Sequence, residues 1–139
     1  MFWDSSALVP LLLPEDRSAA LTAELVADKE ATIWWATPLE CQSAIQRRHR
    51  ETPLPAASLA EATDRLRALV ELIDTVSPTD DVRRRAARLV SVHPLRAADA
   101  LQLAAALIWC EEQPHGEKFV SLDARLRAAA SSEGFELVP

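Results

Sequence analysis

The sequence predicts an α/β fold in which a sheet of short parallel strands is covered by helices on both faces. Short strand-like segments alternate with helical patterns along the chain, and no Asn-Gly hairpin signal joins neighbouring strands. Strands that alternate with helices pair in parallel through right-handed crossovers, which place helices on both faces of the sheet. The chain also contains only 2 glycines and many alanines, a composition that favours helices.

The size and composition indicate one globular domain, 1–139. A chain of 139 residues and 15.3 kDa can bury an adequate core without disulfides or structural metals. Cys41 and Cys110 are isolated in apolar, helix-like stretches, so we expect reduced core residues in a cytoplasmic protein. The longest apolar run, 7–13, is closed by Pro14 and is too short to cross a membrane, so no membrane association is expected.

Two strands and two helices are expected in the first part of the chain. Aromatic and β-branched residues predict strands at 2–3 and 32–35, and in the second one tryptophan should face inward and the other outward. Ser5 or Ser6 can cap a helix that runs to about residue 13. Helical spacing of apolar residues then indicates a second helix to about Asp28.

The next two helices have recognisable start signals. Thr37 can cap a helix with proline in its first position and Glu40 three residues after the cap, and this helix ends in a basic run, 47–50. A capping box that starts at Ser58 opens an amphipathic helix to about Val70.

Three strands and three helices complete the pattern. A strand at 73–76 is followed by a helix capped by Thr79 and then by an apolar helix at 95–110, whose faces are nearly all apolar except at Gln102. A strand at 118–122, a helix that begins at Asp123 and a closing strand follow; the closing strand is expected at 135–138.

Acidic residues recur where this fold collects ligands, beyond the carboxyl ends of its strands. Asp4 and Asp123 follow predicted strands, and Glu40 and Asp99 lie early in predicted helices. Each acid also has a simple structural role open to it. Asp4, Asp99 and Asp123 can cap helices, and Glu40 can complete the capping box that Thr37 opens.

The four acids taken together favour a metal site. Carboxylates at one sheet end repel each other and raise their pKa values unless a cation holds them. Oxygen ligands without nearby histidine or cysteine suit Mg²⁺ or Mn²⁺. The net charge of −6 gives no overall support for nucleic-acid binding, so a polyanion would have to be bound through metal ions or local arginines. The chemistry expected of such a site is phosphodiester hydrolysis.

At these acids the chain resembles the PIN-domain family, and most of all the short toxins of VapBC toxin–antitoxin pairs. The segments "MFWDSSALV", "TPLE", "LRAADALQLAAA" and "FVSLDARLRAAASSEGFEL" resemble the family's four acidic blocks in order and spacing. The resemblance extends from Asp4 to Leu137. It implies a three-layer α/β/α sandwich that acts as a Mg²⁺- or Mn²⁺-dependent endoribonuclease toxin with RNA as its substrate.

The resemblance also implies roles for individual residues. Asp4, Asp99 and Asp123 match the acids that bind metal directly or through water, and Glu40 matches the acid that helps to hold the metal or its water. Supporting roles fall to three further residues that match the pattern: Ser6, Arg96 and Ser121. Many relatives carry threonine or asparagine near the last acid, where Ser121 stands here. A cognate antitoxin and a homodimer are the partners expected by analogy.

Two clusters of arginine have more than one interpretation. Arg47, Arg48 and Arg50 can contact RNA phosphates, or they can be solvated cations at a helix end. The run 83–85 is expected at the surface, offset by neighbouring aspartates.

Two other functions remain open at this point. One is a PIN-fold binding module without catalysis, although such a module would not need all four acids. The other is a phosphotransfer or phosphatase domain with Asp4 as nucleophile, as in haloacid dehalogenases or receiver domains. Those folds require a second aspartate close to the first or a lysine late in the chain, whereas here Asp4 is followed by two serines and Lys118 precedes the last strand.

Overall fold

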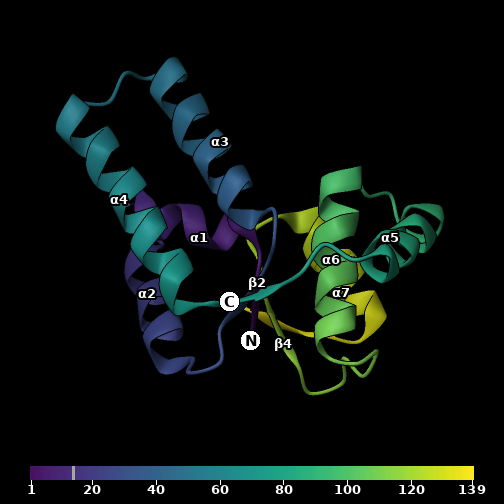
Figure 1. Cartoon of the computed structure of the whole chain (residues 1–139). Coiled ribbons are helices and arrows are strands. Elements are labelled where there is room, and N and C mark those ends of the chain that lie inside the picture. Colours follow the sequence, from purple (N-terminus) through teal and green to yellow (C-terminus); the bar gives the residue numbers. More distant parts are fainter. Residues whose placement is uncertain (14) are drawn as a thin grey trace.

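The computed structural model describes residues 1–13 and 15–139, and in it a five-stranded parallel sheet lies between two layers of helices (Figure 1). Pro14, the expected end of the first apolar run, lies outside the described residues. The strand order is β3-β2-β1-β4-β5, with β1 in the centre. The strands are β1 (Phe2–Trp3), β2 (Thr32–Trp34), β3 (Asp74–Val76), β4 (Lys118–Val120) and β5 (Glu136–Val138). The predicted α/β sandwich with short parallel strands is confirmed.

The helices divide into two groups, one for each face of the sheet (Figure 1). The first four cover one face, and α3 and α4 form a hairpin that projects towards the top of the view. The last three cover the other face. In chain order the helices are α1 (Ser5–Leu12), α2 (Ser18–Ala27), α3 (Thr37–Glu51), α4 (Ala56–Leu72), α5 (Asp80–Val92), α6 (Ala97–Trp109) and α7 (Ala124–Glu133).

Neighbouring apolar residues of β1, β2 and β4 enter different cores, which is why these strands read as short apolar runs without alternation. Phe2 packs in the core under α5, α6 and α7 and stacks on Phe119 with ring centroids 5.7 Å apart. Trp3 points to the opposite core, under α1 to α4, and its indole nitrogen donates to Asp28 Oδ2 at 2.8 Å. The aromatic pair that opens the chain therefore anchors both layers to the central strand.

The two tryptophans at the end of β2 behave as predicted. Trp34 is 4% exposed and packs in the core under α6, whereas Trp35 is 58% exposed. Of the two cysteines, both free thiols, Cys41 is fully buried as expected and Cys110 is only half-buried. Among the described residues, no helix combines the length and apolarity needed to cross a membrane.

The serine cap predicted for α1 and the caps predicted for α3 and α4 are wrong. Asp4 rather than a serine caps α1, because its carboxylate accepts from the Ser6 backbone nitrogen. Helix α3 has Ala36 at its cap position and makes no side-chain cap bond, because Thr37 is fully buried and its hydroxyl bonds to Gln102. Helix α4 starts at Ala56, so the proposed capping box lies inside the helix. The caps predicted at Thr79 and Asp123 are confirmed.

The order of the strands creates a meeting point beside β1. The chain first builds β2 and β3 on one side of β1 and then crosses to build β4 and β5 on the other side. At such a switch point the loops after neighbouring strands separate, and ligands bind there. The switch lies between β1 and β4, and the backbone nitrogen of Asp4 donates to Val120 O at 2.9 Å across it.

Candidate active site

Asp4 lies at this switch point, directly after the central strand. Its side chain is 3% exposed, and Oδ2 accepts hydrogen bonds from the Ser121 hydroxyl at 2.9 Å and from the Ser6 hydroxyl. Burial raises the pKa of Asp4, while the hydrogen bonds from Ser6 and Ser121 oppose that rise. Asp4 is therefore both the cap of α1 and a strongly desolvated acid, so the two roles considered from the sequence coexist.

Ser6 and Ser121 tie the end of β1 to the end of β4. Their hydroxyl oxygens are 3.2 Å apart. Ser6 Oγ accepts from the Leu122 backbone nitrogen at 2.9 Å, and Ser121 Oγ accepts from the Asp123 nitrogen at 3.1 Å. The structure thus places both predicted supporting serines against the Asp4 carboxylate and fixes the backbone that leads to Asp123.

Glu40 lies in the first turn of α3 and is half-buried. Burial raises its pKa, and the negative charges of Asp4 and Asp99 raise it further. The amide nitrogen of Gln102 on α6 donates to Glu40 Oε2 at 2.9 Å, and this bond opposes the rise. Glu40 is not part of a capping box, because Thr37 does not cap α3.

Asp99 and Asp123 approach from the other side of the switch point. Asp99 is the third residue of α6, whose cap position is occupied by Arg96, so the interpretation of Asp99 as a helix cap is wrong. Burial raises the pKa of Asp99, the charge of Asp123 adds to the rise, and the charges of Arg96 and Arg125 oppose it. Asp123 caps α7 through Oδ1, which accepts from the Leu126 nitrogen at 2.8 Å.

The four acids form one electrostatically coupled group at the carboxyl ends of the strands. The charges of Asp4 and Asp99 raise the pKa of Glu40, and the charge of Asp123 raises the pKa of Asp99. Within 1–13 and 15–139, however, no three His, Cys, Asp or Glu side chains approach closely enough to enclose an ion as they stand. The donors are all oxygens, which fits Mg²⁺ or Mn²⁺ in kind. Mutual repulsion also gives a cation a reason to bind there.

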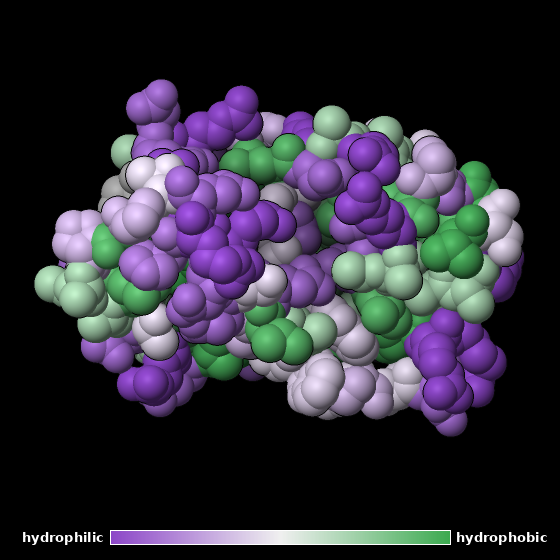
Figure 2. Space-filling model, turned by 90° about the horizontal axis from the view of Figure 1, so that it is seen from above, coloured by the Kyte–Doolittle hydropathy of each residue, from purple (hydrophilic) through white to green (hydrophobic). Residues whose placement is uncertain are grey.

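Two grooves continue from the acids along α3. The first, of about 550 Å³, is lined by Ser5, Ser6, Glu40 and Arg47 among others. The second, of about 410 Å³, shares Arg47 and adds Arg48. Arg50 is exposed near the end of the same helix. Figure 2 looks down on this face of the molecule, and hydrophilic residues occupy much of its middle.

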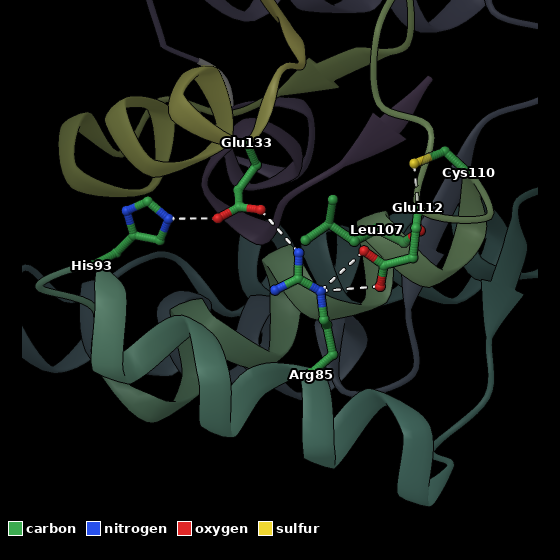
Figure 3. A network of polar contacts seen from close by, with 6 residues as sticks. All are labelled: Arg85, His93, Leu107, Cys110, Glu112 and Glu133. Carbon is green, nitrogen blue, oxygen red and sulfur yellow. Dashed lines mark hydrogen bonds and ion pairs between the residues drawn. The ribbon is translucent and has the colours of Figure 1, made fainter.

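A larger hollow, of about 710 Å³, lies away from the acids, at the end of the sheet where the strands begin, and is lined by the loop after α6 (Figure 1). Next to it, Arg85 donates to Glu112 at 3.0 Å and to Glu133 at 2.9 Å, and His93 contacts Glu133 at 2.7 Å (Figure 3). Arg85 is thus largely buried in a network of ion pairs, and its assignment to the surface is wrong. Its neighbours in the run pair with surface aspartates as predicted.

Three residues near the acids were not assigned to the site from the sequence. Gln102 and Thr37 are buried and hydrogen-bonded to each other, and the sequence signal for Gln102 was its position as a polar residue in an apolar helix. Arg125 is exposed, and its positive charge opposes the rise in the pKa of Asp99. Only its place two residues after Asp123 could have drawn attention to it.

Comparisons with known proteins agree with this geometry. The PIN domain model matches residues 1–131, whereas no curated protein sequence matches the chain. A toxin–antitoxin complex from Klebsiella pneumoniae superimposes with a TM-score of 0.69 at 16% identity, covering 99% of this chain and 95% of that one. FitAcB from Neisseria gonorrhoeae gives 0.67 at 15% identity, covering 99% and 96%.

A third solved structure, PAE2754 from Pyrobaculum aerophilum, gives a TM-score of 0.65 at 22% identity and covers 99% of this chain and 87% of that one. At these identities the three structures show a shared fold. The match of the family model over nearly the whole length shows more, namely that the chain belongs to the PIN domain family.

Proposed function

We propose that this protein is a Mg²⁺- or Mn²⁺-dependent endoribonuclease and the toxin of a toxin–antitoxin pair. The observation that carries the proposal is the coupled group of four acids, Asp4, Glu40, Asp99 and Asp123, at the switch point of a PIN-domain sheet. Burial raises the pKa values of Asp4, Glu40 and Asp99, and such perturbed acids gathered at one place are typical of sites that bind and use a cation.

Each acid has a distinct part in this proposal. Asp4, Asp99 and Asp123 hold the metal directly or through water, and Glu40 helps to hold the metal or its water. When bound, the metal supplies an activated water and stabilises the departing oxygen of the phosphodiester. Ser6 and Ser121 keep the Asp4 carboxylate in place through their hydrogen bonds. Arg96, exposed beside Asp99, is available to a phosphate.

The arginines of α3 offer a path for RNA into the acidic edge. Arg47 lines the same groove as Glu40, and Arg48 lines the next one. Arginine side chains bind phosphates through charge-assisted hydrogen bonds. In this proposal Arg47, Arg48 and Arg50 bind the RNA backbone, which would otherwise be repelled by a chain of net charge −6.

The partners follow from the structural neighbours. One of them is a toxin–antitoxin complex, so a cognate antitoxin is the proposed partner of this chain. The same proposal includes three further points. The protein forms a homodimer, it acts as one domain over 1–139, and it works in the cytoplasm.

The first test is RNA cleavage by the purified protein. Wild type should cleave RNA in Mg²⁺ or Mn²⁺ and lose this activity in EDTA. Asp99→Asn should lower cleavage about a hundredfold or more, because catalysis by metal depends on its charged ligands. Asp64→Asn is the matched control, since Asp64 is an exposed acid paired with Arg67 on α4. Equal cleavage with and without metal would contradict the proposed mechanism.

The second test concerns the role as a toxin. Expression of the wild-type chain should inhibit growth, and Asp4→Asn or Asp99→Asn should relieve the inhibition at equal protein level. Growth curves of the induced strains measure this, with Asp64→Asn again as control. Inhibition that persists in both variants would mean that the acids serve only to cap and pack helices. That result would favour the binding module without catalysis, because a phosphotransfer domain would also need the Asp4 carboxylate.

A further inference from the structure

Gln102 stands out among the buried side chains of α6. It is 1% exposed, and the other buried residues of this helix are all apolar: Ala100, Leu103, Ala104, Ala105, Ala106 and Leu107. Burial of an amide is unfavourable unless its polar atoms find hydrogen-bond partners. An apolar side chain of similar volume would fill the same place without that cost.

The amide reaches across to α3 and contacts two residues there. Its nitrogen, Nε2, donates to Thr37 Oγ1 at 3.0 Å and to Glu40 Oε2 at 2.9 Å. Thr37 and Glu40 are three residues apart on one helix face, so a single amide can reach both. A charged carboxylate only accepts hydrogen bonds, which requires the nitrogen rather than the oxygen of Gln102 to face Glu40. Thr37 is itself fully buried.

Through these contacts Gln102 connects two acids of the site, Glu40 and Asp99. Glu40 is held by the amide, and Asp99 lies three residues before Gln102 on the same helix. The contact therefore fixes both the side chain of Glu40 and the approach of α3 to α6. Displacement of an active-site group by about 1 Å can cost about a hundredfold in rate.

We infer that Gln102 is a positioning residue for the proposed nuclease, oriented by Thr37 and acting through Glu40. The inference rests on the proposed function for its effect on cleavage, whereas the contact itself can be tested without RNA. Gln102 touches neither substrate nor metal in this account. It holds the carboxylate that does.

Kinetics of four variants separate positioning from packing. Gln102→Met keeps the approximate volume and removes the donor, and kcat should fall about 10- to 100-fold with little change in KM. Thr37→Val should act in the same direction, and Thr37→Ser should restore most of the activity. Leu107→Met is the matched control, since it changes another buried residue of α6 and should leave kcat unchanged.

The double variant Thr37→Val, Gln102→Met gives the sharpest result. It replaces both buried polar groups with apolar ones, so its unfolding midpoint should equal or exceed that of Gln102→Met. A positioning role predicts that kcat stays low although stability returns. If cleavage recovers together with stability, the pair only packs the core and the inference is overturned.

A spectroscopic measurement keeps the inference separate from the proposed function. In ¹H–¹⁵N spectra the side-chain amide of Gln102 should be protected and shifted, and Glu40→Gln should move it because a neutral acceptor bonds less strongly. If wild type does not cleave RNA but this response is seen, the proposed function fails and the contact stands. An amide that does not respond to Glu40→Gln overturns the inference, whatever the cleavage assay shows.

Discussion

Asp4 shows at the scale of one residue how burial of an acid makes stability depend on pH. Its carboxylate is nearly fully buried, and burial raises its pKa above the usual 3.8. The folded state then holds the acid's proton more tightly than the unfolded state does. It follows that stability falls as pH rises through the range between the two pKa values. Every unit by which the folded-state pKa exceeds the unfolded one corresponds to about 1.4 kcal/mol.

Asp4→Asn should therefore gain stability over wild type as pH rises above about 4. The amide oxygen can still accept from the Ser6 nitrogen and the Ser121 hydroxyl, so the cap of α1 is kept. Denaturant unfolding in EDTA at a series of pH values measures the difference in free energy of unfolding. Two pH profiles that run parallel would show that Asp4 is not desolvated as described. RNA cleavage by the same variant should be lost.

At the scale of elements, the network of Arg85, His93, Glu112 and Glu133 joins α5, α7 and the loop after α6 (Figure 3). The side chains of Arg85 and Glu133 are 17% and 19% exposed, so the pair is shielded more than the surface pairs of α4 and α5. Burial alone would raise the pKa of Glu133, but hydrogen bonds from His93 and Arg85 outweigh it and lower the pKa.

Glu133→Gln should destabilise the fold by about 1–2 kcal/mol at neutral pH, a value reduced for partial solvent exposure. A lowered pKa means that this stability is present above the usual pKa of 4.5 and is lost as pH falls through the folded-state pKa. The gap between the unfolding curves of wild type and variant should thus close in acid. Glu61→Gln, which breaks an exposed pair with Arg65, should cost almost nothing. Equal losses in the two variants would contradict the network's role.

Individual strands and helices show what local sequence can and cannot predict. Runs such as Phe2–Trp3 and Thr32–Trp34 were identifiable as strands because their residue types and spacing are local signals. The cap of α3 could not be predicted in this way, because the Thr37 hydroxyl is hydrogen-bonded to Gln102, which lies 65 residues further along the chain. Arg85 was assigned to the surface for a similar reason, because its partners come from other elements. Contacts set by tertiary packing override local propensity.

At the scale of the whole molecule, the sheet order explains how scattered acids become neighbours. Four segments far apart in the sequence deliver Asp4, Glu40, Asp99 and Asp123 to the side on which the parallel strands end. The meeting of these acids was predictable from the parallel topology, since all carboxyl ends of such a sheet lie on one edge. The serines and the amide that hold two of them were less so, because hydroxyl and amide contacts depend on side-chain geometry rather than on spacing.

The central claim is that the four acids act together to bind divalent metal, and calorimetric titration with Mn²⁺ at neutral pH tests it without RNA. Wild type and the control Asp64→Asn should bind Mn²⁺ alike, with a single class of site or two coupled ones. Each of Asp4→Asn, Glu40→Gln, Asp99→Asn and Asp123→Asn should weaken binding about tenfold or more. Binding that is unchanged in all four variants, or equally weak in the control, would contradict the claim.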